Sequence, residues 1–143
     1  MPAPDRPVTV VTGGSRGIGA AAVLQLTREG HDVALSYRAN AESAERTVAA
    51  ATRLGGRCIA VQADVTKETE VEELFSSAAD RLGAVTGLVN NAGVTAHIGD
   101  LADTPVDVIR HVIDVNLLGV VICVRDRPLG SCRCVAAASE AAS

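Results

Sequence analysis

Short apolar runs alternate with longer stretches of helical periodicity along most of the chain. Four runs have the length and β-branched content of strands, and four stretches space their apolar residues three or four positions apart. The predicted strands are residues 8–11, 33–37, 58–62 and 85–89, and the predicted helices are residues 18–29, 41–54, 67–82 and 104–125. This alternation predicts an α/β fold, in which a parallel sheet carries helices on both faces.

Local residues add detail to two of the helices. Ile18, Ala22 and Leu26 share one side of the first helix, which is its predicted apolar face. Thr66 is the predicted N-cap of the third helix. Because crossover connections between parallel strands are right-handed, the topology is predicted to be doubly wound.

Length and composition fit one domain with an aliphatic core. The chain has 143 residues, 48% of them apolar, and Tyr37 and Phe75 are its only aromatic side chains. A net charge of −4 without a basic block predicts no nucleic-acid partner. No apolar stretch reaches the ~20 residues of a membrane span, and residues 1–7 do not resemble a signal peptide, so we expect no membrane partner and a cytoplasmic location.

Three segments with different patterns divide the chain. Residues 1–7 are an N-terminal extension, residues 8–125 are the domain, and residues 126–143 are an atypical tail without a clean period. The tail is either a weak fifth strand with a frayed end or a segment unrelated to the domain. The four cysteines lack the spacing of a metal site, so we expect free thiols and no bound metal. They are Cys58, Cys123, Cys132 and Cys134.

A glycine-rich turn, TGGSRGIG at residues 12–19, joins the first predicted strand to the first predicted helix. Gly13 is expected to allow the turn, Gly17 to let the backbone approach a diphosphate, and Gly19 to let helix and sheet pack closely. Free amides and the positive end of the helix dipole would then face phosphate groups. The same glycines also suit a tight turn that binds nothing.

Four motifs occur in an order that resembles the short-chain dehydrogenases/reductases. They are the turn at residues 12–19, Asp64 followed by Val65, the Asn-Asn-Ala-Gly sequence at residues 90–93, and Asn116 in the fourth helix. The resemblance covers about residues 7–124. It implies a Rossmann-type doubly wound sheet that binds a nicotinamide dinucleotide.

The resemblance also implies roles for individual residues. Asp64 receives the adenine amino group, Val65 lies along the adenine, and Asn90 lies near the nicotinamide-side ribose. Asn91 is interpreted as a structural brace between strand four and the turn, and Asn116 is the one catalytic position present, although its role depends on an absent Lys. The implied cofactor-binding residues are Thr12, Gly13, Ser15, Arg16, Gly17, Ile18, Gly19, Tyr37, Arg38, Asp64, Val65, Asn90, Ala92 and Gly93.

The end of the second strand indicates which dinucleotide binds. NAD-dependent relatives place an acidic residue there to hold the ribose hydroxyls. This chain has Tyr37 followed by Arg38, with Arg16 inside the turn. Two guanidinium groups that converge on a 2′-phosphate favour NADP(H) over NAD(H), whereas solvated surface arginines are the alternative interpretation.

Residues for hydride chemistry are missing from these 143 residues. The family uses a Tyr as acid/base, a Lys four residues later that lowers the pKa of the Tyr, and an upstream Ser. Tyr37 is the only Tyr and Lys67 the only Lys, so no Tyr-x-x-x-Lys is present. Ser139 falls loosely where the serine is expected, and His97 is interpreted as an exposed loop histidine. We therefore expect a fold truncated after the fourth strand and its following helix, by truncation or by a shifted reading frame.

Three functional hypotheses follow. The first is an NADP(H)-dependent oxidoreductase that transfers hydride between the nicotinamide and a small carbonyl or alcohol substrate, with this chain alone inactive. The second is a non-catalytic dinucleotide-binding fragment or subunit-pairing module. The apolar face of the fourth helix is a candidate surface for a homo-oligomer. The third is a marginally folded fragment with an exposed sheet edge.

Overall fold

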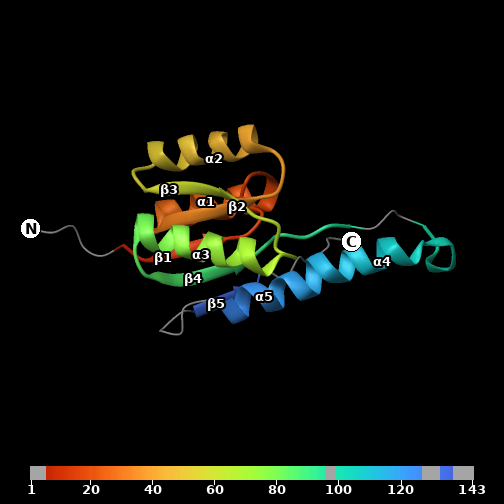
Figure 1. Cartoon of the computed structure of the whole chain (residues 1–143). Helices are drawn as coiled ribbons and strands as arrows, with labels where there is room; N and C mark the ends of the chain where they lie inside the picture. Colours follow the sequence, from red (N-terminus) through yellow and green to blue (C-terminus); the bar gives the residue numbers. More distant parts are fainter. Residues whose placement is uncertain (1–5, 96–98, 127–132, 137–143) are drawn as a thin grey trace, which may run out of the picture.

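A parallel sheet of five strands forms the centre of the molecule (Figure 1). The structure is a computed structural model that describes residues 6–95, 99–126 and 133–136. In spatial order the strands are β3 (Cys58–Gln62), β2 (Asp32–Tyr37), β1 (Val8–Val11), β4 (Val85–Asn90) and β5 (Arg133–Ala136). All four neighbouring pairs are parallel. The chain first builds outward from β1 to β3 and then crosses to the other side of β1, so the strand order reverses between β1 and β4.

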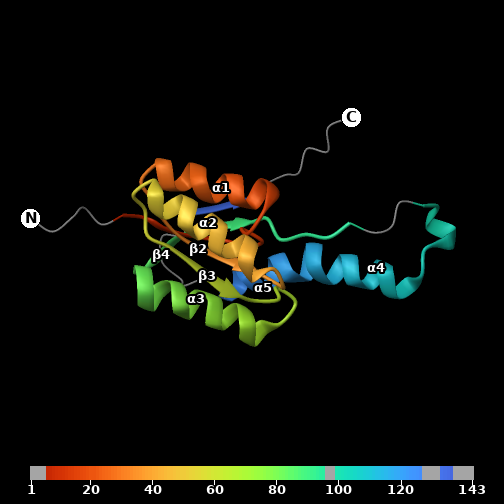
Figure 2. The same cartoon turned by 90° about the horizontal axis from the view of Figure 1, so that it is seen from above.

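Helices cover both faces of this sheet (Figure 2). α1 (Gly17–Arg28) and α2 (Ala41–Arg53) lie on one face, and α3 (Glu68–Leu82) and α5 (Gly119–Asp126) lie on the other. η1 (Leu101–Asp103), α4 (Val106–Ile113) and η2 (Asp114–Leu118) precede α5, and both views show α4 projecting beyond the sheet. The predicted α/β, doubly wound architecture is confirmed.

The alternation of side chains along the strands divides the core into two layers. Val10 and Ala34 pack on the α3 side, whereas Val11 and Leu35 pack on the α1 and α2 side, and all four are 0% exposed. Each fully buried aliphatic side chain of the size of Val or Leu contributes about 1.5–3 kcal/mol to folding. These two aliphatic layers hold the strand ends, and therefore the loops that follow them, in fixed positions.

The predicted apolar face of α1 is correct for Leu26, which packs against the core, and wrong for Ile18. Gly19, Val23 and Thr27 are the buried residues of α1, whereas Ile18 is 71% exposed. Ile18 lies beside a cavity at the start of the helix instead of on the sheet. Periodicity alone does not distinguish an apolar residue that packs on the sheet from one beside a cavity.

The last part of the chain differs from expectation in two ways. The predicted fourth helix is interrupted by a π-helical turn at η2, where the amide of Gly119 donates to the carbonyl of Asp114. The sheet does not end at the fourth strand, because β5 pairs with β4 in the register Leu88↔Cys134. Of the two interpretations of the tail, a fifth strand holds for residues 133–136. β5 has the sequence RCVA and lacks the β-branched run, VTVV, that marks the equally short β1.

An ion cluster closes the amino edge of the sheet, where the strands begin. Asp32 is 0% exposed, and its carboxylate accepts hydrogen bonds from the backbone amide and the Nε of Arg57 at 2.9 and 2.8 Å. Arg6 pairs with the same carboxylate at 3.0 Å, and Arg57 also donates to the carbonyl of Leu82. The cluster thereby ties the residues before β1 and β3 and the end of α3 to the start of β2.

Cys58 and Cys123 are free thiols, as predicted. Burial, with the charge of Asp32, raises the pKa of Cys58 to about 12. Burial, with the charge of Asp126, raises the pKa of Cys123 to about 11. Cys132 lies outside the described residues. Within the described residues, the helices are too short or too polar to cross a bilayer.

Candidate functional site

The glycine-rich turn between β1 and α1 needs its glycines for different steric reasons. Gly13 and Gly17 have left-handed backbone angles, with φ of +66° and +57°. A Cβ at Gly19 would lie 2.2 Å from the carbonyl oxygen of Gly13 and 2.5 Å from Nδ2 of Asn91. The close approach at Gly19 is therefore to the turn itself and to Asn91, not to the sheet surface as predicted. A Cβ at Gly17 would meet nothing within 4 Å, so the space before the turn is open.

The segment after β4 braces this turn. Asn91 donates through Nδ2 to the carbonyls of Thr12 and Gly13, both at 3.0 Å. The hydroxyl of Thr12 accepts the backbone amides of Asn91 and Ala92, also at 3.0 Å. The prediction that Asn91 is a structural brace is confirmed. Thr12 is buried and does not line the cavity. Its hydroxyl supports the turn through these hydrogen bonds.

The end of β2 and the second helix hold the turn from the other side. The hydroxyl of Ser36 accepts the amide of Gly13 at 3.1 Å, and its carbonyl accepts the amide of Gly14 at 3.0 Å. Thr47 of α2 donates its hydroxyl to the carbonyl of Ser15 at 3.0 Å. Sequence reasoning missed both side chains, because only the register of the folded strands and helices brings them to the turn.

The first turn of α1 presents amides without side-chain acceptors. Arg16, which precedes the helix, makes no capping hydrogen bond, and no acidic residue lies in the first turn. The amides at the start of a helix and the helix dipole together favour an anion at this position. The turn therefore has the backbone groups that a diphosphate requires.

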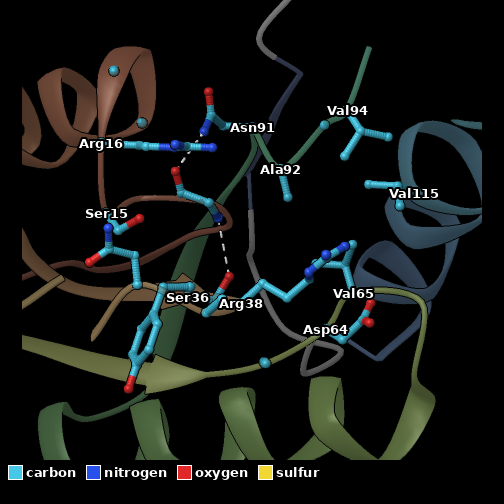
Figure 3. Close-up of a pocket in the computed structure, with 18 of the residues that line it drawn as sticks. Ser15, Arg16, Ser36, Arg38, Asp64, Val65, Asn91, Ala92, Val94 and Val115 are labelled. Carbon is cyan, nitrogen blue, oxygen red and sulfur yellow. Dashed lines mark hydrogen bonds between the residues drawn. The ribbon is translucent and has the colours of Figure 1, made fainter. Parts of the chain in front are cut away.

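These elements surround a cavity of about 790 Å³ at the carboxyl edge of the sheet (Figure 3). Most of the predicted cofactor-binding residues line it, namely Gly13, Ser15, Arg16, Gly17, Ile18, Gly19, Tyr37, Arg38, Asp64, Val65, Ala92 and Gly93. Thr12, Asn90 and Asn116 do not line it. The lining residues absent from the predicted set are Ser36, Ala39, Asn40, Ala63, Asn91, Val94, Thr95, His111 and Val115. His97 and Ser139 lie outside the described residues.

The two arginines border different parts of this cavity. Figure 3 shows the side chain of Arg38 extending toward Asp64 and Val65, whereas that of Arg16 lies across the glycine-rich turn. The convergence of the two guanidinium groups on a 2′-phosphate stays a prediction. The carbonyl of Arg38 accepts Nε2 of Gln62 at 2.9 Å, which fixes the backbone at the end of β2. Both side chains are exposed.

Asp64, after β3, carries a negative charge into the cavity. Partial burial alone would raise its pKa, but hydrogen bonds from the hydroxyl and amide of Thr66, with the charges of Lys67 and Arg38, lower the pKa below its usual value. Thr66 is therefore not the N-cap of α3 as predicted, because its hydroxyl is bonded to Asp64 at 2.7 Å. The next residue, Val65, is buried against Gly119, where a Cβ would lie 2.6 Å from Val65 Cγ2.

The amide of Asn116 is occupied by backbone groups. Its Oδ1 accepts the amide of Val94 and its Nδ2 donates to the carbonyl of Val94, both at 2.8 Å. This pairing fastens the π-helical turn to the segment after β4. In this conformation Asn116 is a structural residue, and the catalytic role implied by the resemblance is not supported by its contacts. π-helical turns are frequently found at functional sites.

A cluster of three carboxylate side chains lies outside the cavity. Glu68, Glu72 and Asp126 offer oxygens within 4.8 Å of one another. Arg125 forms ion pairs with Glu68 and Asp126, which compensates part of their charge. The group therefore has an internal counterion.

The fold and the cavity define a class of protein before any comparison is made. A glycine-rich turn before a helix, at the point where a parallel sheet reverses its strand order, is the arrangement of Rossmann-type nucleotide-binding domains. The model of the short chain dehydrogenase family matches residues 7–127. The chain belongs to this family.

Known proteins resemble the chain over most of its length. It is 39% identical over 118 residues to a 3-oxoacyl-[acyl-carrier-protein] reductase of Synechocystis, covering 82% of this chain and 47% of that protein. It is 34% identical over 119 residues to an oxidoreductase of Escherichia coli, covering 83% of this chain and 48% of that protein. A short chain dehydrogenase of Burkholderia cenocepacia, solved in complex with NADP, superposes with a TM-score of 0.84 at 37% identity and covers 91% of this chain and 54% of that one. The chain thus spans about half the length of these relatives.

Proposed function

We propose that this chain binds NADP(H) in the cavity at the carboxyl edge of the sheet, as the cofactor-binding part of a short-chain oxidoreductase. The observation that carries the proposal is the position of the glycine-rich turn at the reversal between β1 and β4. The turn amides and the start of α1 would hold the diphosphate, and Asp64 and Val65 would hold the adenine. In an intact relative, the nicotinamide would supply hydride to, or accept it from, the carbon of a small carbonyl or alcohol substrate.

The preference for NADP(H) rests on charge at the end of β2. No carboxylate stands there to bond the ribose hydroxyls, and Arg16 and Arg38 border the cavity. A 2′-phosphate bonds well to guanidinium groups. The relative of known structure that contains NADP supports this choice of cofactor.

The chemical step is not expected from these 143 residues by themselves. Tyr37 lines the cavity at the end of β2, whereas Lys67 pairs with Glu70 at 2.9 Å, so the only Tyr and the only Lys do not form an acid/base pair. Asn116 is engaged by Val94. We therefore propose binding without turnover for this chain alone.

Calorimetric titration with NADPH and NADH tests the binding proposal, and NADPH oxidation with a panel of ketones tests the absence of turnover. We expect NADPH to bind at least tenfold more tightly than NADH and no oxidation above the buffer rate. Equal affinities would reject the argument from the arginines, and turnover would reject the argument from the missing pair.

A second candidate function, subunit pairing, is favoured by apolar exposure along the α4–η2–α5 segment. Ile113, Leu117 and Val121 are 50%, 61% and 53% exposed. Contiguous apolar surface of this kind often marks an interface between proteins. We propose that this face forms a homo-oligomer, and sedimentation of the chain and of Leu117→Glu tests it. The variant should sediment as a smaller species, and equal behaviour would oppose the proposal.

A further inference from the structure

Between them, Thr66 and Glu70 form hydrogen bonds with both the side chain and the backbone of Asp64. Its Oδ1 accepts two hydrogen bonds from Thr66, from the backbone amide at 3.0 Å and from the hydroxyl at 2.7 Å. Its own backbone amide donates to Oε2 of Glu70 at 2.7 Å. Among the described residues, Oδ2 has no hydrogen-bond donor, and the side chain borders the cavity.

Hydrogen bonds and neighbouring charges keep the carboxyl groups of Glu70 and Asp64 ionised. The backbone amide of Asp64 and the ammonium of Lys67 bond to Glu70 and lower its pKa, so Glu70 stays an anion that can hold the amide. The hydrogen bonds from Thr66 likewise favour the ionised form of Asp64. An ionised carboxylate accepts hydrogen bonds but cannot donate them. The unpartnered Oδ2 of Asp64 is therefore a hydrogen-bond acceptor for a ligand in the cavity and cannot act as a donor.

We propose that Thr66 and Glu70 are positioning residues, which fix Asp64 so that its free oxygen selects a base with an exocyclic amino group over a base with an oxo group at the same place. The inference rests on the proposed function, in which Asp64 lies at the adenine end of the bound dinucleotide. An amino group donates to the carboxylate. An oxo group is an acceptor, and two acceptors repel each other while the carboxylate loses its solvation.

The contribution of the Thr66 hydroxyl to this selection can be tested by substitution. In Thr66→Val the backbone amide still donates to Asp64, but the hydroxyl bond is lost and the carboxylate gains rotational freedom. In Thr66→Ser the hydroxyl is retained. Thr52 offers a matched control, because its hydroxyl is exposed and bonds only to the carbonyl of Val48 in its own helix.

The experiment is a calorimetric titration of the full chain with NADP⁺ and with its deaminated analogue, nicotinamide hypoxanthine dinucleotide phosphate. For the unmodified chain we expect NADP⁺ to bind roughly tenfold more tightly or better, as for one charge-assisted hydrogen bond replaced by a repulsive contact. Thr66→Val should reduce this ratio severalfold, by weakening NADP⁺ more than the analogue. Thr66→Ser and the control Thr52→Val should keep the ratio.

A pH series adds a readout that loss of stability would not produce. Protonation of Asp64 removes the acceptor, so the ratio should fall as the pH drops through the pKa of this carboxyl group. Removal of the Thr66 hydroxyl raises that pKa toward its usual value, so Thr66→Val should lose selectivity at a higher pH than the unmodified chain.

Each outcome has one meaning. If the unmodified chain binds neither dinucleotide, the proposed function fails. If it binds both equally, or if Thr66→Val weakens both by the same factor, the proposed function stands and the positioning inference is overturned. If melting shows that Thr66→Val does not fold, Glu70→Gln takes its place, since it weakens the grip on the Asp64 amide, and an unchanged ratio in that variant overturns the inference.

Discussion

The two edges of the sheet use a carboxylate and arginines in opposite ways. At the amino edge, Asp32 is fully buried, and both of its oxygens are engaged by Arg6 and Arg57. At the carboxyl edge, Asp64 keeps one oxygen without a donor among the described residues, and Arg38 extends into a cavity. The same chemical groups stabilise the fold where the chain satisfies them and are available for binding where it does not.

This contrast predicts that substitutions at the two edges have separable effects. A change at the amino edge should lower stability and leave the affinity of the folded protein for a dinucleotide unchanged. A change at the carboxyl edge should mainly alter affinity or selectivity.

The largest effect is expected from Arg57→Met at the amino edge. This variant leaves the buried Asp32 with Arg6 as its remaining cation and removes the bond to Leu82. Breaking a buried pair from one side costs about 3–5 kcal/mol, and because Arg57 is itself 60% exposed we expect the lower end of that range. Urea unfolding gives the free energy. Arg53→Met on α2 is the control and should change stability by less than about 0.5 kcal/mol. Equal stability of the two variants would show that the cluster does not hold the edge together.

Gly19→Ala at the carboxyl edge should come next. Its Cβ would overlap the carbonyl of Gly13, so the turn must shift, with a cost of about 1–3 kcal/mol and a large loss of NADPH affinity. Gly30→Ala is the control for affinity, because Ala at its φ of +94° strains the backbone and lowers stability, whereas Gly30 does not line the cavity. Titration and melting of both variants separate the effects. Normal NADPH binding by Gly19→Ala would show that the glycine-rich turn is not part of the binding site.

The smallest effect is expected from Arg38→Gln. Loss of the guanidinium should weaken NADPH about tenfold and leave NADH binding and the melting temperature nearly unchanged, because Arg38 is exposed. Parallel titration with both dinucleotides measures the change in preference. An unchanged preference for NADPH over NADH would show that Arg38 is a solvated surface residue without a role in binding.

Much of the fold was predictable because it depends on local pattern. The four strands of aliphatic residues, the turn and the Asp after β3 all follow from periodicity and short motifs. Ser36 and Thr47 were not predictable as supports of the turn, because their partners are 23 and 32 positions away in sequence. Ile18 was wrongly assigned to the buried face of α1, because it is apolar but lies beside the cavity.

The positions of the predicted residues around the cavity followed from the sequence, but the contacts among them did not. Twelve of the fourteen predicted cofactor-binding residues line the cavity, since the motifs mark the ends of adjacent strands. Thr66 was assigned to the wrong role because an N-cap and a bond to the preceding Asp look alike in sequence. The occupation of the Asn116 amide by Val94 depends on the π-helical turn, which apolar spacing does not reveal.

That wide turn also sets the rotational phase of the long helix. A residue inserted into an α-helix rotates everything beyond it by about 100° about the axis, since one α-helical residue corresponds to that angle. The insertion lets Ile122 and Cys123 pack on the sheet while His111 and Val115 face the cavity. Deleting one residue within Asp114–Leu118 would restore a regular helix and turn one of these two faces away from its partner.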